Sequence, residues 1–351
     1  MRLLNLKTIT FFNNKGGVGK TTLVSNVSAY LNYKMRKKIL VLDADPQANT
    51  TQMAISDEYW ETYYGINPTR QTIKDLFMPI VDGEANIDPD IEITRGSEHN
   101  FLFDLIPGHP SLSMFEDVLS DSWAKSLSGD TGGIRKTNWL NLLKERYDNS
   151  YDFLIIDVGP SLGALNRSIL LNSEYFMTPM GSDIFSLMSL SNISSWIKTW
   201  EDDYDNAIQQ ALRKNSDSLT KYPINKDTKL TTRYIGYSVQ QYNARKFKDG
   251  KRPVKAYDNI IGQIHENIVS YLSQFSSPSI KRWSQLKLGD VPYLSSIIPM
   301  AQSTNTPLFL LTSKEGIRGG QGLSVIDATN MIDQISKNLL INIEGEGNER
   351  E

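Results

Sequence analysis

The order of apolar and polar segments along the chain predicts alternating strands and helices. Near the N-terminus, an apolar run over residues 9–12 precedes a glycine-rich segment, and apolar residues then recur at helical spacing from Leu23 to Leu31. A second apolar run, Ile39–Leu42, follows and ends at Asp43. The pattern predicts an α/β fold, with a mostly parallel sheet and helices on both of its faces.

Later apolar runs predict further strands of the same sheet. These runs lie at residues 101–106, 151–157, 175–179 and 234–243. A helix is expected to begin at Asn49. Residues 201–230 are polar and charged, and we expect them to leave the fold as an excursion.

Two longer helices are predicted from apolar residues that recur every three or four positions. One runs from Ile184, and its apolar stripe consists of Leu187, Leu190, Ile193, Ile197 and Trp200. This stripe is expected to be core, with contact to a partner as the alternative. The final helix is expected from Leu323 to Leu340, with an inward face made of Val325, Ile326, Ile332, Ile335 and Leu339.

The glycine-rich segment Lys15–Thr22 has the chemistry of a phosphate-binding loop. Its glycines let successive backbone N–H groups turn toward an anion, and the positive end of the next helix points at the same place. Lys20 is then placed to reach the β- and γ-phosphates, and the Thr21 hydroxyl to ligate Mg²⁺. A chance glycine-rich turn is the alternative, and eight matching residues between a strand and a helix argue against it.

Two carboxylates stand where predicted strands end. Asp45 follows the run Ile39–Leu42, and Asp157 ends the run that begins at Tyr151. Open α/β sheets bind ligands at the carboxyl ends of their strands. An aspartate at a strand end is often only a helix cap or a turn residue, but the nearby phosphate loop favours a functional role for both.

The sequence Lys-Gly-Gly-Val-Gly-Lys-Thr-Thr at residues 15–22 resembles the deviant phosphate loop of the ParA/MinD family of ATPases. Asn14 stands where the general pattern has glycine. Asp-Ala-Asp-Pro-Gln at 43–47 resembles the family's D-x-D-P-Q switch, and the strand ending at Asp157 resembles the one that carries its second aspartate. The resemblance follows the order of elements from residue 7 to about 341 and includes the family's L-I-P-G…L-S…E stretch, which ends here at Glu116.

This resemblance implies an ATP-dependent homodimer that hydrolyses ATP slowly with Mg²⁺. It assigns Lys15 to the partner's nucleotide, Asp45 to orienting the attacking water, and Asp157 to holding Mg²⁺ through a water. Gly159 replaces a proline common in the family, so this second switch is expected to be more flexible. The expected catalytic residues are Asp45, Lys15 and Lys20, and the expected metal ligands are Thr21, Asp45 and Asp157. The expected phosphate contacts are Lys15, Gly16, Gly17, Val18, Gly19, Lys20, Thr21 and Thr22.

The base contacts are also expected from the resemblance. Asn243, at the end of the run from Tyr234, and Pro299, in a last strand at 297–299, are the expected adenine contacts. Guanine-specific proteins carry an N-K-x-D strand end. Asn225-Lys226-Asp227-Thr228 places the aspartate one position early, in a polar stretch, so ATP is favoured over GTP.

Composition excludes several classes of protein. The chain of 351 residues has no cysteine, which excludes cysteine-held iron–sulfur clusters, such as those of the nitrogenase iron protein and the iron–sulfur scaffold ATPases, and fits a cytoplasmic location. Its three histidines are far apart in sequence, so a histidine metal site is not expected. Residues 344–351 are acidic and glycine-broken, unlike the basic membrane-binding helix of MinD-type proteins, so no membrane contact is expected. We expect one ATPase domain over residues 1–342, with a long excursion at about 200–295, and an acidic tail at 343–351.

One local segment is strongly basic although the whole chain has a net charge of −3. Six cations against one carboxylate, Asp249, give residues 245–255 a local charge of +5, and they suggest a contact to the phosphates of DNA or RNA. A solvated loop, or a loop that pairs with an acidic partner, is the alternative. The six cations are Arg245, Lys246, Lys248, Lys251, Arg252 and Lys255.

Three functions therefore stay open. The first is a partition or positioning ATPase that binds DNA non-specifically as an ATP-loaded dimer and is stimulated by an activating partner protein. The second is the ATPase module of a multi-protein complex, such as a defence or assembly system, in which residues 200–295 dock a protein. The third is a metabolic ATP-dependent enzyme, for which no second catalytic cluster was found in the sequence.

Overall fold

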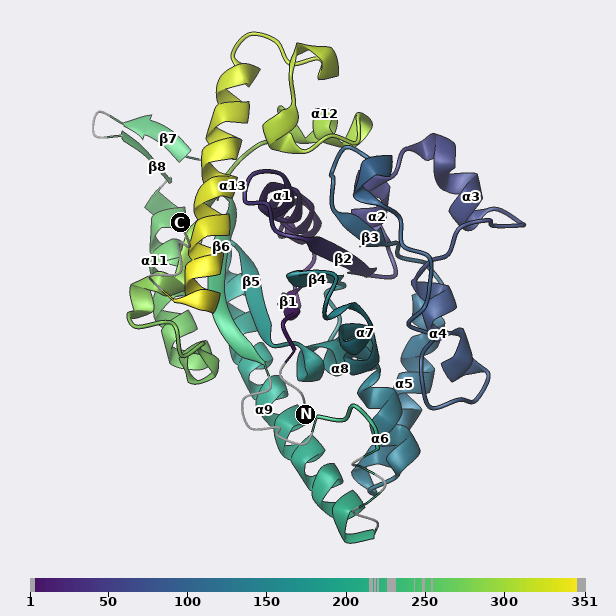
Figure 1. Cartoon of the computed structure of the whole chain (residues 1–351). Coiled ribbons are helices and arrows are strands. Elements are labelled where there is room, and N and C mark those ends of the chain that lie inside the picture. Colours follow the sequence, from purple (N-terminus) through teal and green to yellow (C-terminus); the bar gives the residue numbers. More distant parts are fainter. Residues whose placement is uncertain are drawn as a thin grey trace.

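The computed structural model describes residues 4–214, 217, 219, 221–225, 232–242, 244–247, 250–253 and 255–345, with the backbone alone described within 241–259. Seven parallel strands form one sheet in the order β3-β2-β4-β1-β5-β6-β9 (Figure 1). The predicted α/β fold is confirmed. The strands are β1 (Lys7–Phe11), β2 (Ile39–Ala44), β3 (Asp104–Ile106), β4 (Phe153–Val158), β5 (Tyr175–Gly181), β6 (Arg233–Tyr242) and β9 (Lys287–Pro292).

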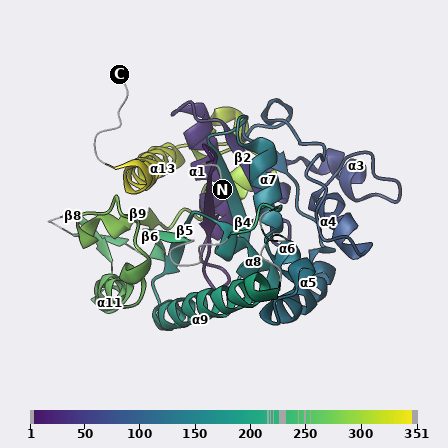
Figure 2. The same ribbon diagram turned by 60° about the horizontal axis from the view of Figure 1, so that its bottom comes forward.

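Helices cover both faces of the sheet (Figure 2). One face is covered by α1 (Lys20–Tyr33), α2 (Asn49–Ala54), α3 (Trp60–Tyr64), α12 (Ile298–Ser303) and α13 (Gln321–Glu344). The other is covered by α4 (Ile73–Val81), α5 (Leu112–Leu127), α6 (Thr131–Thr137), α7 (Trp139–Tyr147), α8 (Ala164–Asn172), α9 (Ile184–Lys214) and α11 (Lys255–Leu272). Two short strands, β7 (Ala244–Phe247) and β8 (Gly250–Pro253), form a separate antiparallel hairpin.

The central strands β2 and β4 are mostly apolar because each one serves two cores. Successive side chains of a strand point to opposite faces of the sheet. In β2, Leu40 and Leu42 belong to the core under α4–α9, whereas Ile39 and Val41 belong to the core under α1 and α13. Burial on both faces explains the uninterrupted apolar runs of the sequence.

The register of the sheet brings the polar strand ends together. Asp157 of β4 lies beside Phe11 of β1 on one side and beside Asp43 of β2 on the other. The loop that leaves β1 and the carboxylates that end β2 and β4 therefore meet at one edge, which is where open α/β sheets bind ligands.

The structure corrects four of the predicted elements. The strand expected at 101–106 is regular only from Asp104, although Phe101 and Phe103 are buried. Residues 201–214, predicted to leave the fold, continue α9 because Tyr204, Ala207, Ile208 and Ala211 extend its buried stripe.

The other two corrections concern the C-terminal region. Residues 297–299 are not the last strand; β9 is, and Pro299 lies in the first turn of α12, where its fixed φ and missing N–H are tolerated. The final helix extends from Gln321 to Glu344, and Ile326 is exposed rather than inward-facing. The buried stripe of α9, from Leu187 to Trp200, and the start of α2 at Asn49 are confirmed.

Within the described residues, no helix is long and apolar enough to cross a bilayer. The same part of the chain holds no cluster of three or more histidine, aspartate or glutamate side chains arranged as a metal site.

Candidate functional site

The predicted phosphate loop joins β1 to α1 as a tight glycine turn. Gly17 and Gly19 have φ values of +75° and +73°, a left-handed conformation that other residues rarely adopt. Gly19 is the N-cap of α1, and no side chain in the described part of the chain caps that helix. The free N–H groups of the first turn of α1 and the loop therefore face the same space, as in an anion site.

Asn13 holds this loop against the sheet. Its buried amide donates to the backbone carbonyl of Pro179 in β5 at 2.7 Å, and its Oδ1 accepts from the N–H of Lys15 at 3.0 Å. The Lys20 ammonium donates to the Asn13 carbonyl at 3.4 Å. Asn13 was not identified from the sequence, because its role depends on a strand 166 residues away.

Asp157 lies under the loop as a fully buried carboxylate. Its Oδ2 accepts from the Thr21 hydroxyl at 2.9 Å and from the Thr50 hydroxyl at 2.8 Å. Its Oδ1 is buried and has no hydrogen-bond partner among the described residues. An unpaired carboxylate oxygen beside a hydroxyl suits a hard divalent cation, so Thr21 and Asp157 fit the implied Mg²⁺. Thr50, missed by the sequence analysis, is a second hydroxyl at this place.

Asp43 anchors the first switch segment and contacts neither the loop nor the cavity. Its carboxylate accepts from the Thr51 N–H at 2.8 Å, from the Thr51 hydroxyl at 2.7 Å and from the Asp45 N–H at 3.3 Å. The Thr51 hydroxyl also accepts from the Gly108 N–H at 2.8 Å. These hydrogen bonds connect β2, α2 and the residue that follows β3. They therefore fix the backbone of the segment that carries Asp45.

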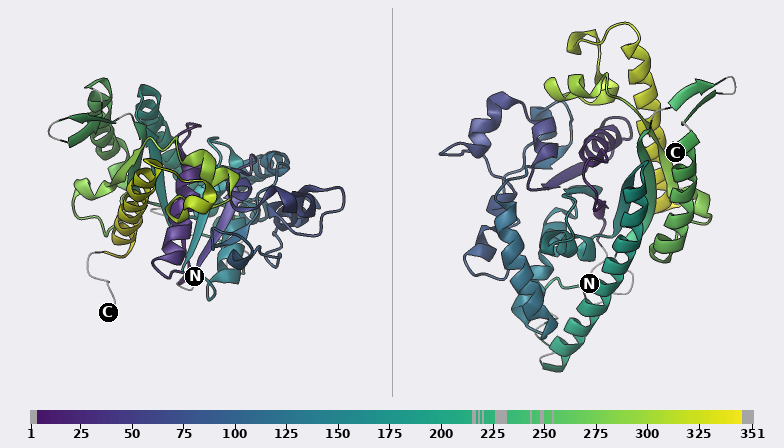
Figure 3. Two further views of the ribbon diagram at one scale, coloured as in Figure 1. Left: turned by 90° about the horizontal axis from the view of Figure 1, so that it is seen from above. Right: turned by 180° about the vertical axis from the view of Figure 1, so that it is seen from behind.

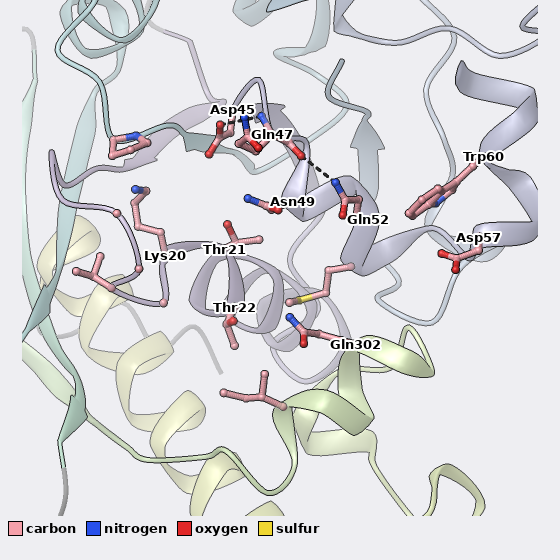
Figure 4. Close-up of a pocket in the computed structure, with 17 residues that line it drawn as sticks. Lys20, Thr21, Thr22, Asp45, Gln47, Asn49, Gln52, Asp57, Trp60 and Gln302 are labelled. Atoms are coloured by element: carbon pink, nitrogen blue, oxygen red, sulfur yellow. Dashed lines mark hydrogen bonds between the residues drawn. The ribbon is translucent and has the colours of Figure 1, made fainter. Parts of the chain in front are cut away.

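Asp45 has a different environment. Its Oδ1 accepts from the N–H of Gln47 at 3.0 Å, and its side chain faces the space above the loop (Figure 4). A Cβ at residue 159 would lie 3.2 Å from the same oxygen, so the segment after β4 packs directly on Asp45. The two segments predicted as switches are therefore in contact.

A cavity of about 670 Å³ opens over the phosphate loop. Lys20 and Thr21 lie at one end with Asp45, and Trp60 and Asp57 lie at the other (Figure 4). Its lining residues are Gly16, Gly17, Val18, Gly19, Lys20, Thr21, Thr22, Asp45, Gln47, Asn49, Gln52, Met53, Asp57, Trp60, Pro160, Ile298 and Gln302. A space of this size, with backbone donors and a lysine at its polar end, suits a small phosphorylated ligand.

Burial shifts the ionisation of the charged groups under the loop. Desolvation lowers the pKa of Lys20, while the charges of Asp157 and Asp45 oppose that shift. Desolvation raises the pKa of Asp157 to about 6, and hydrogen bonds from Thr50 and Thr21 and the Lys20 charge oppose it. Burial and then the charge of Asp157 raise the pKa of Asp43 to about 8. Negative charge at this site is therefore costly until a cation is added.

These shifts predict that the free energy of unfolding falls as the pH rises. The carboxyl group of Asp157 titrates near 6 when folded and near about 3.9 when unfolded, so between these values the folded chain holds a proton that the unfolded chain lacks. The free energy of unfolding of the wild type should fall between about pH 5 and pH 8. In the Asp157→Asn variant this fall should be smaller by about 1–2 kcal/mol. Urea unfolding at both pH values measures this, with exposed Asp117→Asn as the control. Equal losses in all three proteins would contradict the prediction.

Lys15 does not line the cavity in this single chain. Its ammonium forms an ion pair with Asp183, just before α9, and lies 6.0 Å from the centre of the Phe185 ring. Ile184, Phe185 and Met188 at the start of α9 are 53%, 67% and 61% exposed. A lysine of the phosphate loop is thus held at the edge of an exposed apolar patch.

The structure describes only one of the two expected base contacts. Asn243 lies outside the described residues. Pro299 is described, but the cavities near the loop are lined by its neighbour Ile298. A narrow second cavity joins the first at Gly19, Thr22 and Ile298. Its volume is about 20 Å³, and the rest of its lining is largely apolar and consists of Leu23, Asn26, Gln240, Val291, Pro292, Leu294, Leu308, Met331 and Ile332.

The basic segment folds as a hairpin and not as a loop. Arg245 lies opposite Arg252, and Lys246 lies opposite Lys251, in the antiparallel register of β7 and β8. The hairpin projects from the body next to α11 (Figure 3). Lys248 lies outside the described residues, and Lys255 begins α11.

Comparison with known proteins agrees with this site. A family model described as an AAA domain matches residues 6–210, which contain the phosphate loop, both switch segments and Asp157. A virulence plasmid ParA family protein, pGP5-D of Chlamydia psittaci, is 31% identical over 196 residues, 55% of this chain and 64% of its own length. The match thus spans less than two thirds of that curated relative.

Solved structures match over more of the chain. Protein DIP2308 of Corynebacterium diphtheriae is 28% identical with a TM-score of 0.73, covering 97% of this chain and 99% of its own. McdA of Cyanothece, solved in complex with ATP, is 16% identical with a TM-score of 0.59 over 99% and 100% of the two chains, and it shows a shared fold.

Proposed function

The chain belongs to the AAA-domain family that includes the ParA/MinD-type ATPases, and from that premise we propose that it is an ATP-driven dimer switch that acts in DNA partition or positioning. One observation carries the proposal most directly. Lys20, Thr21 and Asp45 lie at one end of a cavity large enough for a nucleotide, and the buried Asp157, from a third segment of the chain, accepts a hydrogen bond from Thr21.

The ligand we propose is ATP with Mg²⁺. The backbone N–H groups of residues 16–20 and the Lys20 ammonium would hold the β- and γ-phosphates. Thr21 and Asp157, with Asp45 nearby, would hold Mg²⁺, which offsets the negative charge of the phosphates during hydrolysis. The raised pKa of Asp157 fits this role, because the added cation would favour its ionised form.

We place the base against Ile298, toward the narrow cavity. Pro292, which ends the last strand, lines that cavity, so it replaces Pro299 in our proposal as the proline beside the base. Gln240 of β6 lines the same cavity and offers an amide to the edge of the base. Asn243 remains a prediction of the sequence alone.

Hydrolysis in our proposal depends on Asp45 and on a second copy of the chain. The Asp45 carboxylate is fixed by Gln47 and abuts the segment after β4, so it can orient a water toward the γ-phosphate. Lys15 is turned away from its own cavity, and Lys20 already lies beneath the phosphates. We propose that Lys15 exchanges Asp183 for the nucleotide of a facing copy, while Ile184, Phe185 and Met188 become buried between the two.

Lys15→Ala should therefore bind ATP with nearly unchanged affinity and remain a monomer. The loss of a cation from the transition state should lower hydrolysis by on the order of 100-fold. Sedimentation with ATP, in an Asp45→Ala background, measures the association state. Asp183→Asn is the matched variant, because it removes the ion pair of the free chain but keeps Lys15, and it should still dimerise.

Two results would contradict this role for Lys15. A Lys15→Ala protein that dimerises and hydrolyses ATP normally would exclude it. Equal defects in Lys15→Ala and Asp183→Asn would assign Lys15 to holding the start of α9 within its own chain.

For the output we propose non-specific DNA binding through the β7–β8 hairpin. Arg245 faces Arg252, and Lys246 faces Lys251, and like charges directly opposite in a ladder destabilise it. The major groove of DNA admits a two-stranded ribbon and presents phosphates on both sides.

A further inference from the structure

Glu116 links α5 to the start of α8, outside the cavity. Its carboxylate accepts from the backbone N–H groups of Ala164 and Leu165, the latter at 3.0 Å. These are free N–H groups of the first turn of α8, which a helix cannot satisfy by itself. A carboxylate at this position also interacts favourably with the helix dipole.

The contact requires glycine at residue 163. Gly163 is the N-cap of α8 and has no side chain to cap it, and a Cβ there would overlap the Glu116 carboxylate. Glu116 therefore supplies, from a helix about fifty residues earlier in the chain, the cap that a serine or aspartate usually supplies locally.

The same first turn holds the segment between Asp157 and α8. The Asn166 amide donates to the carbonyls of Gly159 at 2.8 Å and Ser161 at 2.7 Å. Gly159 packs against Asp45, and Pro160 lines the cavity. The position of the α8 N-terminus thus sets the position of residues 159–163 relative to Asp45.

A second contact strengthens the link between the same two helices. The Arg167 guanidinium of α8 lies 4.2 Å from the centre of the Trp123 ring of α5. It is half-buried; burial lowers the pKa of Arg167 to about 10, and the charge of Glu116 opposes that shift. Glu116 therefore lies between the N-terminus of α8 and a cation of the same helix.

We propose that Glu116 is a positioning residue for ATP hydrolysis, which it supports by fixing α8 and residues 159–163 against Asp45. The inference rests on the proposed ATPase function. Glu116 touches neither the cavity nor the phosphate loop, so it should affect turnover and leave nucleotide affinity nearly unchanged. Because Glu116 belongs to α5, a movement of α5 would also change the position of residues 159–163.

The test compares Glu116→Ala and Glu116→Gln with Asp117→Ala, an exposed neighbour on α5. Three quantities are measured on the full chain: the dissociation constant of ATP, kcat at saturating ATP with Mg²⁺, and hydrogen exchange of residues 159–166. Loss of a cap of this kind should speed local exchange by roughly two- to thirtyfold. Glu116→Ala should lower kcat by a similar factor and change ATP affinity by less than about twofold.

Glu116→Gln keeps one acceptor oxygen and should restore part of both kcat and exchange protection. Asp117→Ala should behave as wild type. Faster hydrogen exchange across the whole sheet in Glu116→Ala would indicate that the substitution destabilises the entire fold. In that case the proposal is tested on Glu116→Gln, because this variant keeps the packing of α5.

Two outcomes would overturn the proposal in an active protein. One is wild-type exchange in Glu116→Ala, and the other is fast exchange with unchanged kcat. A wild-type chain that hydrolyses no ATP would instead contradict the proposed function, whatever the exchange of the Glu116 variants.

Discussion

Asp45→Ala should bind ATP as tightly as the wild type and hydrolyse it at least about 100-fold more slowly. The change removes the only carboxylate of the first switch that faces the cavity and leaves the Gly16–Thr22 cradle intact. Asp43 cannot substitute, because its oxygens are occupied by Thr51 and the Asp45 backbone. Single-turnover hydrolysis and equilibrium binding of ATP, measured on one preparation, separate the two effects.

Asp57→Ala is the matched control. Asp57 lines the same cavity as Asp45 but at the end beside Trp60, away from Lys20 (Figure 4). It should therefore keep normal turnover, although it also loses one carboxylate. Lys20→Ala should give the opposite pattern to Asp45→Ala, with binding itself weakened because a cation under the phosphates is lost.

The result for Asp45→Ala also bears on the dimer. A protein that binds ATP without consuming it should accumulate in the associated state. Hydrolysis at the wild-type rate would show that another group positions the water, and our assignment of the first switch would then be wrong.

The motifs made the chemistry of this site predictable, whereas its supporting contacts were not. Residues 15–22 and Asp157 could be identified from their spacing in the sequence, because backbone donors and a carboxylate must stand at fixed offsets from strand ends. Asn13 and Thr50 carry no such pattern. Each is an ordinary polar residue whose partner, Pro179 or Asp157, is distant in sequence.

The errors in the fold have a similar cause. Pro299 follows two isoleucines and resembles a strand end, yet proline equally opens a helix, and tertiary packing selected α12. The helix from Ile184 was ended too early because residues 201–214 are mostly charged on their exposed side. Their buried side is sparse but continuous, and it is recognisable only from the fold, in which Tyr204 stacks on Trp123 of α5 and accepts a hydrogen bond from Asn138 after α6.

Reversing the charges of the hairpin should abolish DNA binding and leave ATP hydrolysis nearly intact. The variant Lys251→Glu with Arg252→Glu changes one member of each cross-strand pair. It replaces two like-charge pairs by two opposite-charge pairs, so the hairpin itself should become more stable. A loss of DNA binding could then not be attributed to unfolding of the hairpin.

The control carries the same change in charge elsewhere. Arg213→Glu with Lys221→Glu alters two exposed cations at and after the end of α9, which lies at the opposite end of the molecule from the hairpin (Figure 1). If net charge alone governs binding, both double variants should weaken it equally. If the hairpin is the contact, only the first should.

Salt supplies an independent measurement. If four phosphates are neutralised, the logarithm of the binding constant should fall with a slope of about −3.6 against the logarithm of salt concentration. Raising salt from about 50 to 200 mM would then weaken binding on the order of 100-fold. The hairpin variant should show a slope closer to zero, because fewer counterions are released.

The assay is run with ATP, with ADP and without nucleotide, since the proposal requires binding by the ATP-loaded dimer. Tight binding that ignores salt would indicate base contacts or aggregation and would contradict a phosphate-backbone mode. Absence of binding in every nucleotide state would exclude DNA as the output. The cations of the hairpin would then be better explained by an acidic partner protein, as in the ATPase module of a larger complex, because two opposed pairs of like charges still need an anionic surface to offset their repulsion.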